Sequence, residues 1–234
     1  MISIVIPAYN EAKWIGSCLK ALTQQTALES FEVIVVDNNS TDTTGEEAKK
    51  FAKLLRLRLI TEKQPGRGIA RAAGFAAARG EIILSTDADA IVPPDWIETL
   101  YEELKNPNIG AVTGTCNIAD SSLVKNALFN WIQPTAMFVF RLVFGFYWLS
   151  GFSFGIKKSI YERAGGFVKD LQTQEDIALS FAVRKLTYIR LVNLPVLVSG
   201  RRFKQGLLKG FMPYLTTFID YFLLKKRVYL SNER

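Results

Sequence analysis

Hydrophobic residues in the first part of the chain form short runs, separated by stretches whose apolar positions recur with helical spacing. The runs are at residues 2–7, 31–36, 57–60 and 82–85, and each contains a single polar residue. Runs of this length indicate strands buried on both faces of a sheet. Helical spacing is found at residues 11–27, 42–55 and 69–78. This alternation predicts an α/β fold with a mostly parallel, doubly wound sheet flanked by helices, and residues 1–90 are predicted to be its nucleotide-binding half.

The second half of the chain is less regular. Residues 109–116 and 151–156 have strand patterns, and the glycines of the second would allow close backbone approach. Residues 177–185 have a helical pattern, and residues 123–149 are very apolar. Polar or helix-breaking residues interrupt that stretch at Lys125, Asn130, Gln133, Pro134 and Arg141. Because no unbroken apolar run of about 18 residues remains, we predict a buried or interfacial helix rather than a transmembrane one.

Residues 203–234 mix aromatic residues, leucines and lysines. Within them, residues 206–224 are nearly long enough to span a bilayer, but Lys209, Pro213 and Asp220 argue against spanning. We predict an amphipathic helix lying on the membrane surface; the alternative is a helix packed on the domain or in a homodimer interface. The predicted organisation is one domain over residues 1–202, with residues 91–202 as its acceptor-binding half, followed by this apolar helical appendage.

Composition limits the chemistry that the chain can perform. With 234 residues, 49% of them hydrophobic, the chain can bury one large core. It contains no histidine, which excludes histidine bases, Ser-His-Asp triads and histidine-ligated metals. Cys18 and Cys116 are far apart and form no CxxC pattern, so neither a zinc site nor a disulfide scaffold is predicted. Acid–base chemistry must come from carboxylates, and metal binding from oxygen ligands.

The net charge of +7 comes with basic residues clustered late in the chain, beside aromatic segments. The basic clusters are at residues 157–158, 201–202 and 225–227. Basic residues next to apolar ones favour an anionic membrane surface over nucleic acid as a partner. Residues 1–7 lack the features of a signal peptide, so we expect a cytoplasmic location, peripheral at the inner face of the cell membrane.

Acidic residues follow the predicted strand at residues 82–85. Asp87 and Asp89 are separated by one alanine, and alternate residues of an extended chain point the same way, so the two can share one hard cation. The carboxyl ends of parallel strands meet at one edge of a sheet, where open α/β sheets bind ligands. Residues 9–11 and 37–38 are therefore expected beside the two acids.

Three further features have both a functional and a structural interpretation. The loop at residues 66–68 is either a phosphate loop or an ordinary loop before a helix. Arg71, one turn into that helix, is either a phosphate contact or a solvated surface arginine. Glu175 and Asp176 either belong to a site or only favour the first turn of their helix.

Several motifs occur together in one order along the chain. They are residues 7–11 (Pro-Ala-Tyr-Asn-Glu), 36–42 (Val-Asp-Asn-Asn-Ser-Thr-Asp), 70–74, 87–89 (Asp-Ala-Asp), 165–167 (Gly-Gly-Phe) and 175–176 (Glu-Asp). The series resembles the family 2 inverting glycosyltransferases of the GT-A fold over residues 2–202. The resemblance implies transfer of a sugar from a UDP- or GDP-linked donor to a glycan or lipid-linked acceptor.

The resemblance also implies a role for each matched residue. Asp176 would be the catalytic base that takes the proton of the acceptor hydroxyl. Asp89, assisted by Asp87, would hold Mg or Mn. The implied nucleotide-sugar contacts are Pro7, Ala8, Tyr9, Glu11, Asp37, Arg67, Arg71, Asp87 and Ala88. Near the acceptor or the diphosphate would lie Glu175, Arg201 and Arg202.

Two departures from the family pattern affect this interpretation. The usual Asp-Asp-Gly-Ser loop is Asp-Asn-Asn-Ser at residues 37–40, so one acid is missing. The Gln-x-x-Arg-Trp motif of processive synthases is absent after Ser199, which favours transfer of a single sugar.

Three alternatives stay open from the sequence. The first is a polyprenyl-phosphate sugar synthase, whose ionised acceptor needs no base. The second is a sugar nucleotidyltransferase, which would use the same kind of acids and metal. The third is a membrane-associated binding module without activity.

Overall fold

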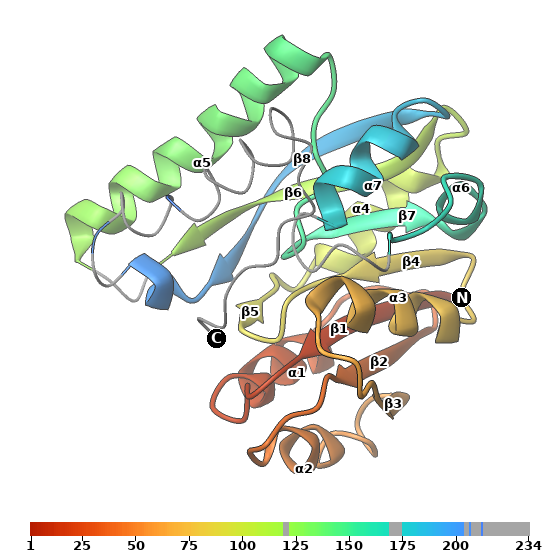
Figure 1. The fold of residues 1–234 in the computed structure, drawn as a ribbon, viewed down its shortest axis with the longest axis vertical. Coiled ribbons are helices and arrows are strands. Elements are labelled where there is room, and N and C mark those ends of the chain that lie inside the picture. The colour runs from red at the N-terminus through yellow and green to blue at the C-terminus, as the bar shows by residue number, and fades with distance from the viewer. Residues whose placement is uncertain (119–121, 169–174, 204–205, 207–211, 213–234) are drawn as a thin grey trace.

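The computed structural model describes residues 1–118, 122–168, 175–203, 206 and 212. They form one eight-stranded mixed sheet with helices on both faces, in the strand order β3-β2-β1-β4-β7-β6-β8-β5 (Figure 1). The predicted α/β fold is therefore confirmed. The predicted appendage at residues 203–234 lies, apart from residues 203, 206 and 212, outside the described part of the chain.

The sheet has a parallel half and a mixed half. Its strands are β1 (Ile2–Ala8), β2 (Phe31–Asp37), β3 (Leu57–Thr61), β4 (Ile82–Ser85), β5 (Ala90–Ile91), β6 (Ile109–Ile118), β7 (Phe154–Lys157) and β8 (Tyr188–Val198). Strands β3, β2, β1 and β4 run parallel to one another, and β6 and β8 run parallel to each other. Strand β7 runs antiparallel between β4 and β6, and β5 runs antiparallel to β8.

The helices pack into two large hydrophobic cores, one on each face of the sheet, and a small third cluster formed with Phe129 and Phe203. The helices are α1 (Ile15–Thr23), α2 (Thr44–Lys49), α3 (Arg67–Ala77), α4 (Trp96–Lys105), α5 (Leu123–Phe144), α6 (Lys158–Arg163), α7 (Glu175–Val183) and the short 3₁₀ helix η1 (Gly200–Phe203). One core contains side chains of α1, α2 and α4, and the other contains side chains of α3, α6, α7 and the end of α5. Burial on both faces explains why β1 consists of apolar and small residues throughout.

The first half of the chain follows the predicted alternation, with shorter helices. Helix α1 begins at Ile15 because the preceding backbone is held by the loop after β2: Glu11 N donates to Thr44 Oγ1 and Ala12 N to Asp42 Oδ2. In the second half, β5, β8, α4 and α6 have no counterpart in the predicted pattern. The strand predicted at residues 151–156 begins at Phe154, because Ser153 N donates to Ser150 O in a turn.

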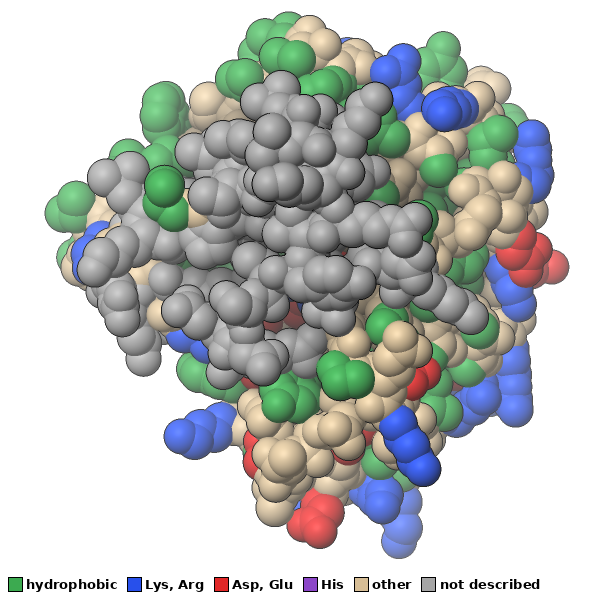
Figure 2. Space-filling view, in the orientation of Figure 1, with side chains coloured by type: hydrophobic (Ala, Val, Ile, Leu, Met, Phe, Trp, Pro, Cys, Tyr) green, Lys and Arg blue, Asp and Glu red, His purple; other side chains and the backbone are tan. Residues whose placement is uncertain are grey.

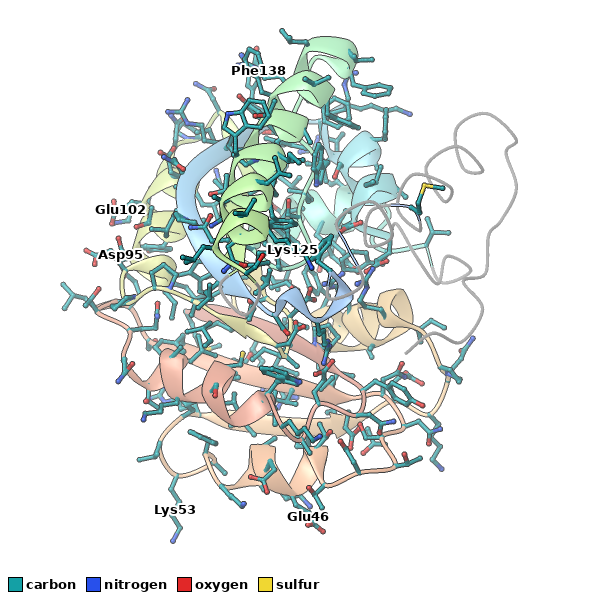
Figure 3. All side chains as sticks on the ribbon, turned by 90° about the vertical axis from the view of Figure 1, so that its left-hand side faces the viewer. Glu46, Lys53, Asp95, Glu102, Lys125 and Phe138 are labelled. Atoms are coloured by element: carbon teal, nitrogen blue, oxygen red, sulfur yellow. The ribbon has the colours of Figure 1, made fainter. Side chains whose placement is uncertain are left out.

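Helix α5 lies along one edge of the molecule with much of its surface outside the core. Ser122 Oγ caps it by accepting from Lys125 N, and Gly145 ends it with a φ of 80°. Figure 2 shows hydrophobic side chains along the upper left edge, over α5. In the turned view of Figure 3 the helix faces the viewer, with Lys125 and Phe138 labelled on it.

Helix α3 approaches β1 closely enough to require a glycine. A Cβ at Gly74 would lie 2.3 Å from Val5 Cγ1 and 2.9 Å from Val36 Cγ2. Both valines are fully buried, so neither can move away freely. The close approach brings the start of α3, with Arg67 and Arg71, to the polar edge of the sheet.

We predict that Gly74→Ala lowers the free energy of unfolding by about 1–3 kcal/mol, because the new methyl group overpacks the core. Gly16→Ala in α1 is the matched control, since its Cβ would meet nothing within 4 Å. That change should stabilise the protein by roughly 0.5–1 kcal/mol through helix propensity. Urea unfolding of both variants measures the difference; equal effects would contradict the packing argument.

Candidate functional site

Three strand ends meet at one edge of the sheet, as predicted. The parallel register sets Ala8 opposite Asp37 and Val5 opposite Ser85, so the residues that follow each strand emerge together. Pro7 and Ala8 are buried at the end of β1. Tyr9 and Glu11 follow them directly. This edge is the candidate site.

The loop after β2 is built around two side chains. Asp37 Oδ1 accepts from Ser40 N at 3.0 Å. The buried Asn38 amide donates to Glu62 O and Gln64 O, and its oxygen accepts from Gly66 N. A carboxylate cannot donate to two carbonyls, which explains why an asparagine is found at the second position of this loop, where the family pattern usually has an aspartate. Asn38 ties the strand end to the loop that starts α3, a structural role that the sequence did not reveal.

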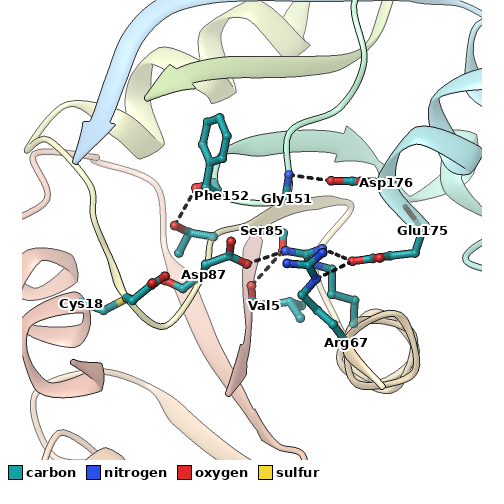
Figure 4. A network of polar contacts seen from close by, with 12 residues as sticks. Val5, Cys18, Arg67, Ser85, Asp87, Gly151, Phe152, Glu175 and Asp176 are labelled. Atoms are coloured by element: carbon teal, nitrogen blue, oxygen red, sulfur yellow. Dashed lines mark hydrogen bonds and ion pairs between the residues drawn. The ribbon is translucent and has the colours of Figure 1, made fainter. Parts of the chain in front are cut away.

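The buried Arg71 connects the two predicted acid motifs through Asp87 and Glu175, which are labelled in Figure 4. The Arg71 side chain is fully enclosed; Nη2 donates to Asp87 Oδ1 at 2.5 Å and Nη1 donates to Glu175 Oε1. Arg67 Nε also donates to Glu175 Oε1, at 3.2 Å. The interpretation of Arg71 as a solvated surface residue is therefore wrong, and it acts on the site through Asp87 and Glu175. Glu175 is likewise more than a helix-favouring acid, because its side chain is fully buried in this ion pair.

The predicted base lies next to this network. Asp176 Oδ2 accepts from Gly151 N at 3.1 Å (Figure 4). Burial, and then the charge of Glu175, raise the pKa of Asp176 to about 6, while Arg71 and Arg67 oppose the shift. The carboxylate is still ionised at neutral pH, yet basic enough to take a proton.

Gly151 matters for a second reason. A Cβ at this position would lie 2.4 Å from Arg71 Nη2, so only glycine lets the backbone pass this close to the guanidinium. The close backbone approach expected from the glycines of this segment is confirmed at Gly151. Its N–H thereby fixes Asp176 beside Arg71.

A second arginine closes the other side of the site. Arg201 Nη1 donates to Glu11 Oε2 at 2.8 Å, and Arg201 Nη2 lies 3.1 Å from Asp89 Oδ2. Because β5 runs antiparallel to β8, the residue before β5 and the residues after β8 are neighbours. The hydrogen bond with Glu11 raises the pKa of Arg201 further. The side chain of Arg202 lies outside the described part of the chain.

The acids at residues 87 and 89 lie in a turn, not on an extended strand. Strand β4 ends at Ser85, and Ala90 N donates to Asp87 O. The expectation that the two share a cation was based on alternate residues of an extended strand pointing the same way, and that basis is wrong because these residues are not on a strand. Cys18 Sγ donates to Asp87 O at 3.5 Å, and burial raises the pKa of this thiol, so it stays a neutral hydrogen-bond donor. The side chain of Ala88 is buried in the core.

The donor set nevertheless fits a hard cation. Among the residues that the structure describes, no group of three or more ligating side chains occurs. Two carboxylates suit Mg or Mn where substrate phosphates supply the other oxygen ligands. Asp89 would have to exchange its ion pair with Arg201 for the metal.

Solved structures of similar fold agree with this architecture. A mannosyltransferase from Pyrobaculum calidifontis, in complex with GDP-Man and Mn2+, is 25% identical with a TM-score of 0.67, covering 92% of this chain and 64% of that one. S. aureus TarS in complex with UDP has the same TM-score of 0.67 at 19% identity, covering 85% of this chain and 60% of that one. The fold is the GT-A fold of nucleotide-sugar transferases.

Within that class, residues 3–165 match Glycosyl transferase family 2, and the chain belongs to this family. Glycosyltransferase GlyG of Streptococcus pneumoniae is 35% identical over 52% of this chain and 41% of its own length. Glycosyltransferase GlyA of the same organism is 26% identical over 99% of this chain and 29% of its own length. The chain therefore spans less than half of these relatives. Family membership favours glycosyl transfer over the nucleotidyltransferase and binding-module alternatives.

We predict that Arg71→Met lowers the free energy of unfolding by roughly 3–5 kcal/mol, because it leaves the buried Glu175 charge with only the partly exposed Arg67 as an ion-pair partner. The double variant Arg71→Met/Glu175→Leu should recover part of that loss. Lys50→Met, which removes an exposed pair with Glu47, should leave the urea midpoint nearly unchanged. An Arg71→Met variant as stable as the parent would show that the pair does not hold the site together.

Proposed function

We propose that this protein transfers a single sugar from a nucleotide-diphosphate sugar to an acceptor hydroxyl, with inversion of the anomeric configuration. Asp176 is the general base of this reaction. The observation that carries the proposal is the environment of Asp176, held by Gly151 N and raised in pKa to about 6 beside a buried ion pair. A base of this strength suits a neutral hydroxyl acceptor at physiological pH.

The reaction follows from the placement of these groups. The donor nucleotide lies along the strand ends, where Asp37 and the backbone of Pro7 and Ala8 contact the base and ribose. The acceptor oxygen gives its proton to Asp176 Oδ1 or Oδ2 and attacks the anomeric carbon from the face opposite the leaving nucleotide. One displacement inverts the configuration and needs no covalent enzyme intermediate. Absence of the processive motif supports transfer of one sugar.

Asp89, with Asp87, would hold the divalent cation, Mg or Mn. When bound, the cation neutralises the negative charge that develops on the departing diphosphate. Arg201, once released from Asp89, and Arg67 at the start of α3 would contact that charge. Support for a metal comes from the oxygen donor set and from the Mn2+ in the Pyrobaculum mannosyltransferase.

The donor and acceptor classes are part of the proposal. The similar structures bind UDP and GDP-Man, which supports a UDP- or GDP-linked donor. The acceptor is a glycan or lipid-linked hydroxyl. Release of nucleoside diphosphate from a panel of UDP-, GDP- and dTDP-sugars, with and without candidate acceptors, tests the activity. The absence of release from every donor would contradict it.

The second candidate is transfer to a polyprenyl phosphate. The apolar outer surface of α5 favours a lipid-borne acceptor of either kind. A phosphate acceptor is already ionised, so the two reactions differ in their need for Asp176.

We expect Asp176→Asn to lower kcat by about 10²-fold or more, with KM for the donor little changed, because it removes the proton acceptor. In the parent, kcat should fall about tenfold per pH unit below an apparent pKa near 6, since the protonated base is inactive. Asp95→Asn, at an exposed position just before α4, is the control and should behave as the parent. If Asp176→Asn transfers sugar at the parental rate, the acceptor is a phosphate and base catalysis is wrong.

Asp89→Ala should abolish the strengthening of UDP or GDP binding by Mg or Mn, which we expect to be about tenfold or more in the parent. Titration calorimetry with metal or with EDTA measures this difference. Arg201→Met is the matched control, because it frees the same carboxylate from its ion pair and should keep the metal effect. A metal effect that survives in Asp89→Ala would place the cation elsewhere.

A further inference from the structure

Helix α5 has two apolar faces that point in opposite directions. Phe129, Met137 and Phe140 are buried against the domain. On the other side a stripe of apolar residues follows the spacing i, i+4, i+7 with large exposed fractions. This stripe, called the α5 stripe below, consists of Val124 (77%), Leu128 (45%), Trp131 (66%), Phe138 (50%) and Leu142 (69%). At about 100° per residue, its centre is roughly opposite the centre of the buried face.

Polar atoms hardly interrupt the stripe. Thr135 falls within it, but its hydroxyl donates to Trp131 O and so has its partner inside the helix. The stripe extends about 27 Å along the helix axis, from position 124 to position 142. A helix on the surface of a water-soluble domain normally turns charged or polar residues outward. An outward apolar face of this length marks an interaction surface.

The inner face shows that the helix lies along the domain. Asn130 Oδ1 accepts from Ile118 N and Gln133 Oε1 accepts from Cys116 N, so two side chains bond the backbone of β6. By length and composition α5 could cross a membrane, with a mean hydropathy of 1.2 over its most apolar window. A helix bonded to a sheet strand at Asn130 and Gln133 would lose these bonds if it crossed a membrane away from the domain. Its position along the domain suits contact with a flat surface instead.

The two charged residues of α5 are both basic. Lys125 and Arg141 lie about 100° to either side of the centre of the α5 stripe, in the places from which long side chains reach around an apolar face. Arg184 joins them at the carboxyl end of the helix, where Nη1 donates to Phe144 O. From Ser121 to Tyr161 the sequence contains no acidic residue. Apolar in the middle and basic at the margins, the surface is complementary to an anionic lipid interface.

We propose that α5 docks this domain on an anionic membrane surface, with the α5 stripe inserted among the lipids and Lys125 and Arg141 at the headgroups. Trp131, in the middle of the stripe, has the amphipathic ring that suits this depth. A partner protein would have to place acidic residues opposite Lys125 and Arg141. An anionic lipid surface presents negative headgroups along the whole length of the helix.

The chain that follows α5 runs to the candidate site. After Gly145 the chain passes Leu149, whose N–H donates to Ser180 Oγ on α7, and reaches Gly151, whose N–H holds Asp176. The membrane contact therefore lies on the element that precedes the base-positioning turn. If the proposed function holds, docking through α5 favours a lipid-linked acceptor. The docking itself does not depend on the proposed function.

Vesicle co-sedimentation of the full chain tests the docking without any donor or acceptor. The parent should bind vesicles of phosphatidylcholine mixed with phosphatidylglycerol more strongly than vesicles of phosphatidylcholine alone. Trp131→Ser/Phe138→Ser should weaken binding to the mixed vesicles at least about tenfold, because it removes the two aromatic residues of the stripe. The control Leu28→Ser/Leu54→Ser removes exposed apolar side chains elsewhere and should bind as the parent does.

Lys125→Gln/Arg141→Gln should reduce binding to the mixed vesicles while leaving the weak binding to phosphatidylcholine unchanged. Far-UV circular dichroism checks that each variant is folded. Two results would overturn the proposal. One is stripe-variant binding equal to that of the parent. The other is a parent that sediments as a dimer without lipid and becomes monomeric in the stripe variant, which would make the α5 stripe a homodimer interface.

Discussion

The buried ion pair between Arg71 and Glu175 is the interaction on which the candidate site depends. Each side chain is fully enclosed, so neither charge has water to stabilise it and each needs the other. Because Arg71 also holds Asp87, the pair fixes the start of α7 against the turn after β4. The proposed donor side and the base side of the site, far apart in the sequence, thereby become one rigid unit. Gly151 completes it, since only a missing side chain leaves room for the guanidinium.

Arg71 and Arg201 have different environments and therefore different roles in the site. Arg71 is enclosed and positions carboxylates, whereas Arg201 is partly exposed and spans Glu11 and Asp89. A partly exposed ion pair contributes little to stability and can be exchanged for other partners. The same carboxylate that pairs with Arg201 is the proposed metal ligand. The ion pairs of Arg71 are thus buried and hard to exchange, whereas those of Arg201 can be exchanged. This difference suits the binding and release of the proposed charged donor.

Helix α5 connects the chemistry of the site to its proposed surroundings. Its inner face is bonded to β6, and its outer face is apolar between basic margins. The chain that leaves α5 reaches, at Gly151, the N–H that orients Asp176, so a short segment connects the proposed docking helix to the site.

Local pattern alone determined the parallel half of the fold and the convergence of its acids. Strands β1 to β4 were predictable because each is a short, mainly apolar run, buried on both faces in β1, β2 and β4, and parallel strand ends must meet at one edge. The order of the motifs along the chain was also sufficient to indicate the family. Strand β8 was missed because polar residues and a proline interrupt it, and its pairing with β5 and β6 is long-range. Only tertiary structure could decide that Arg71 is buried rather than solvated, that Asn38 replaces an acid to donate twice, and that Arg201 reaches Glu11 across 190 positions. Each of these depends on which side chains meet in space, and the pattern along a chain does not contain that information.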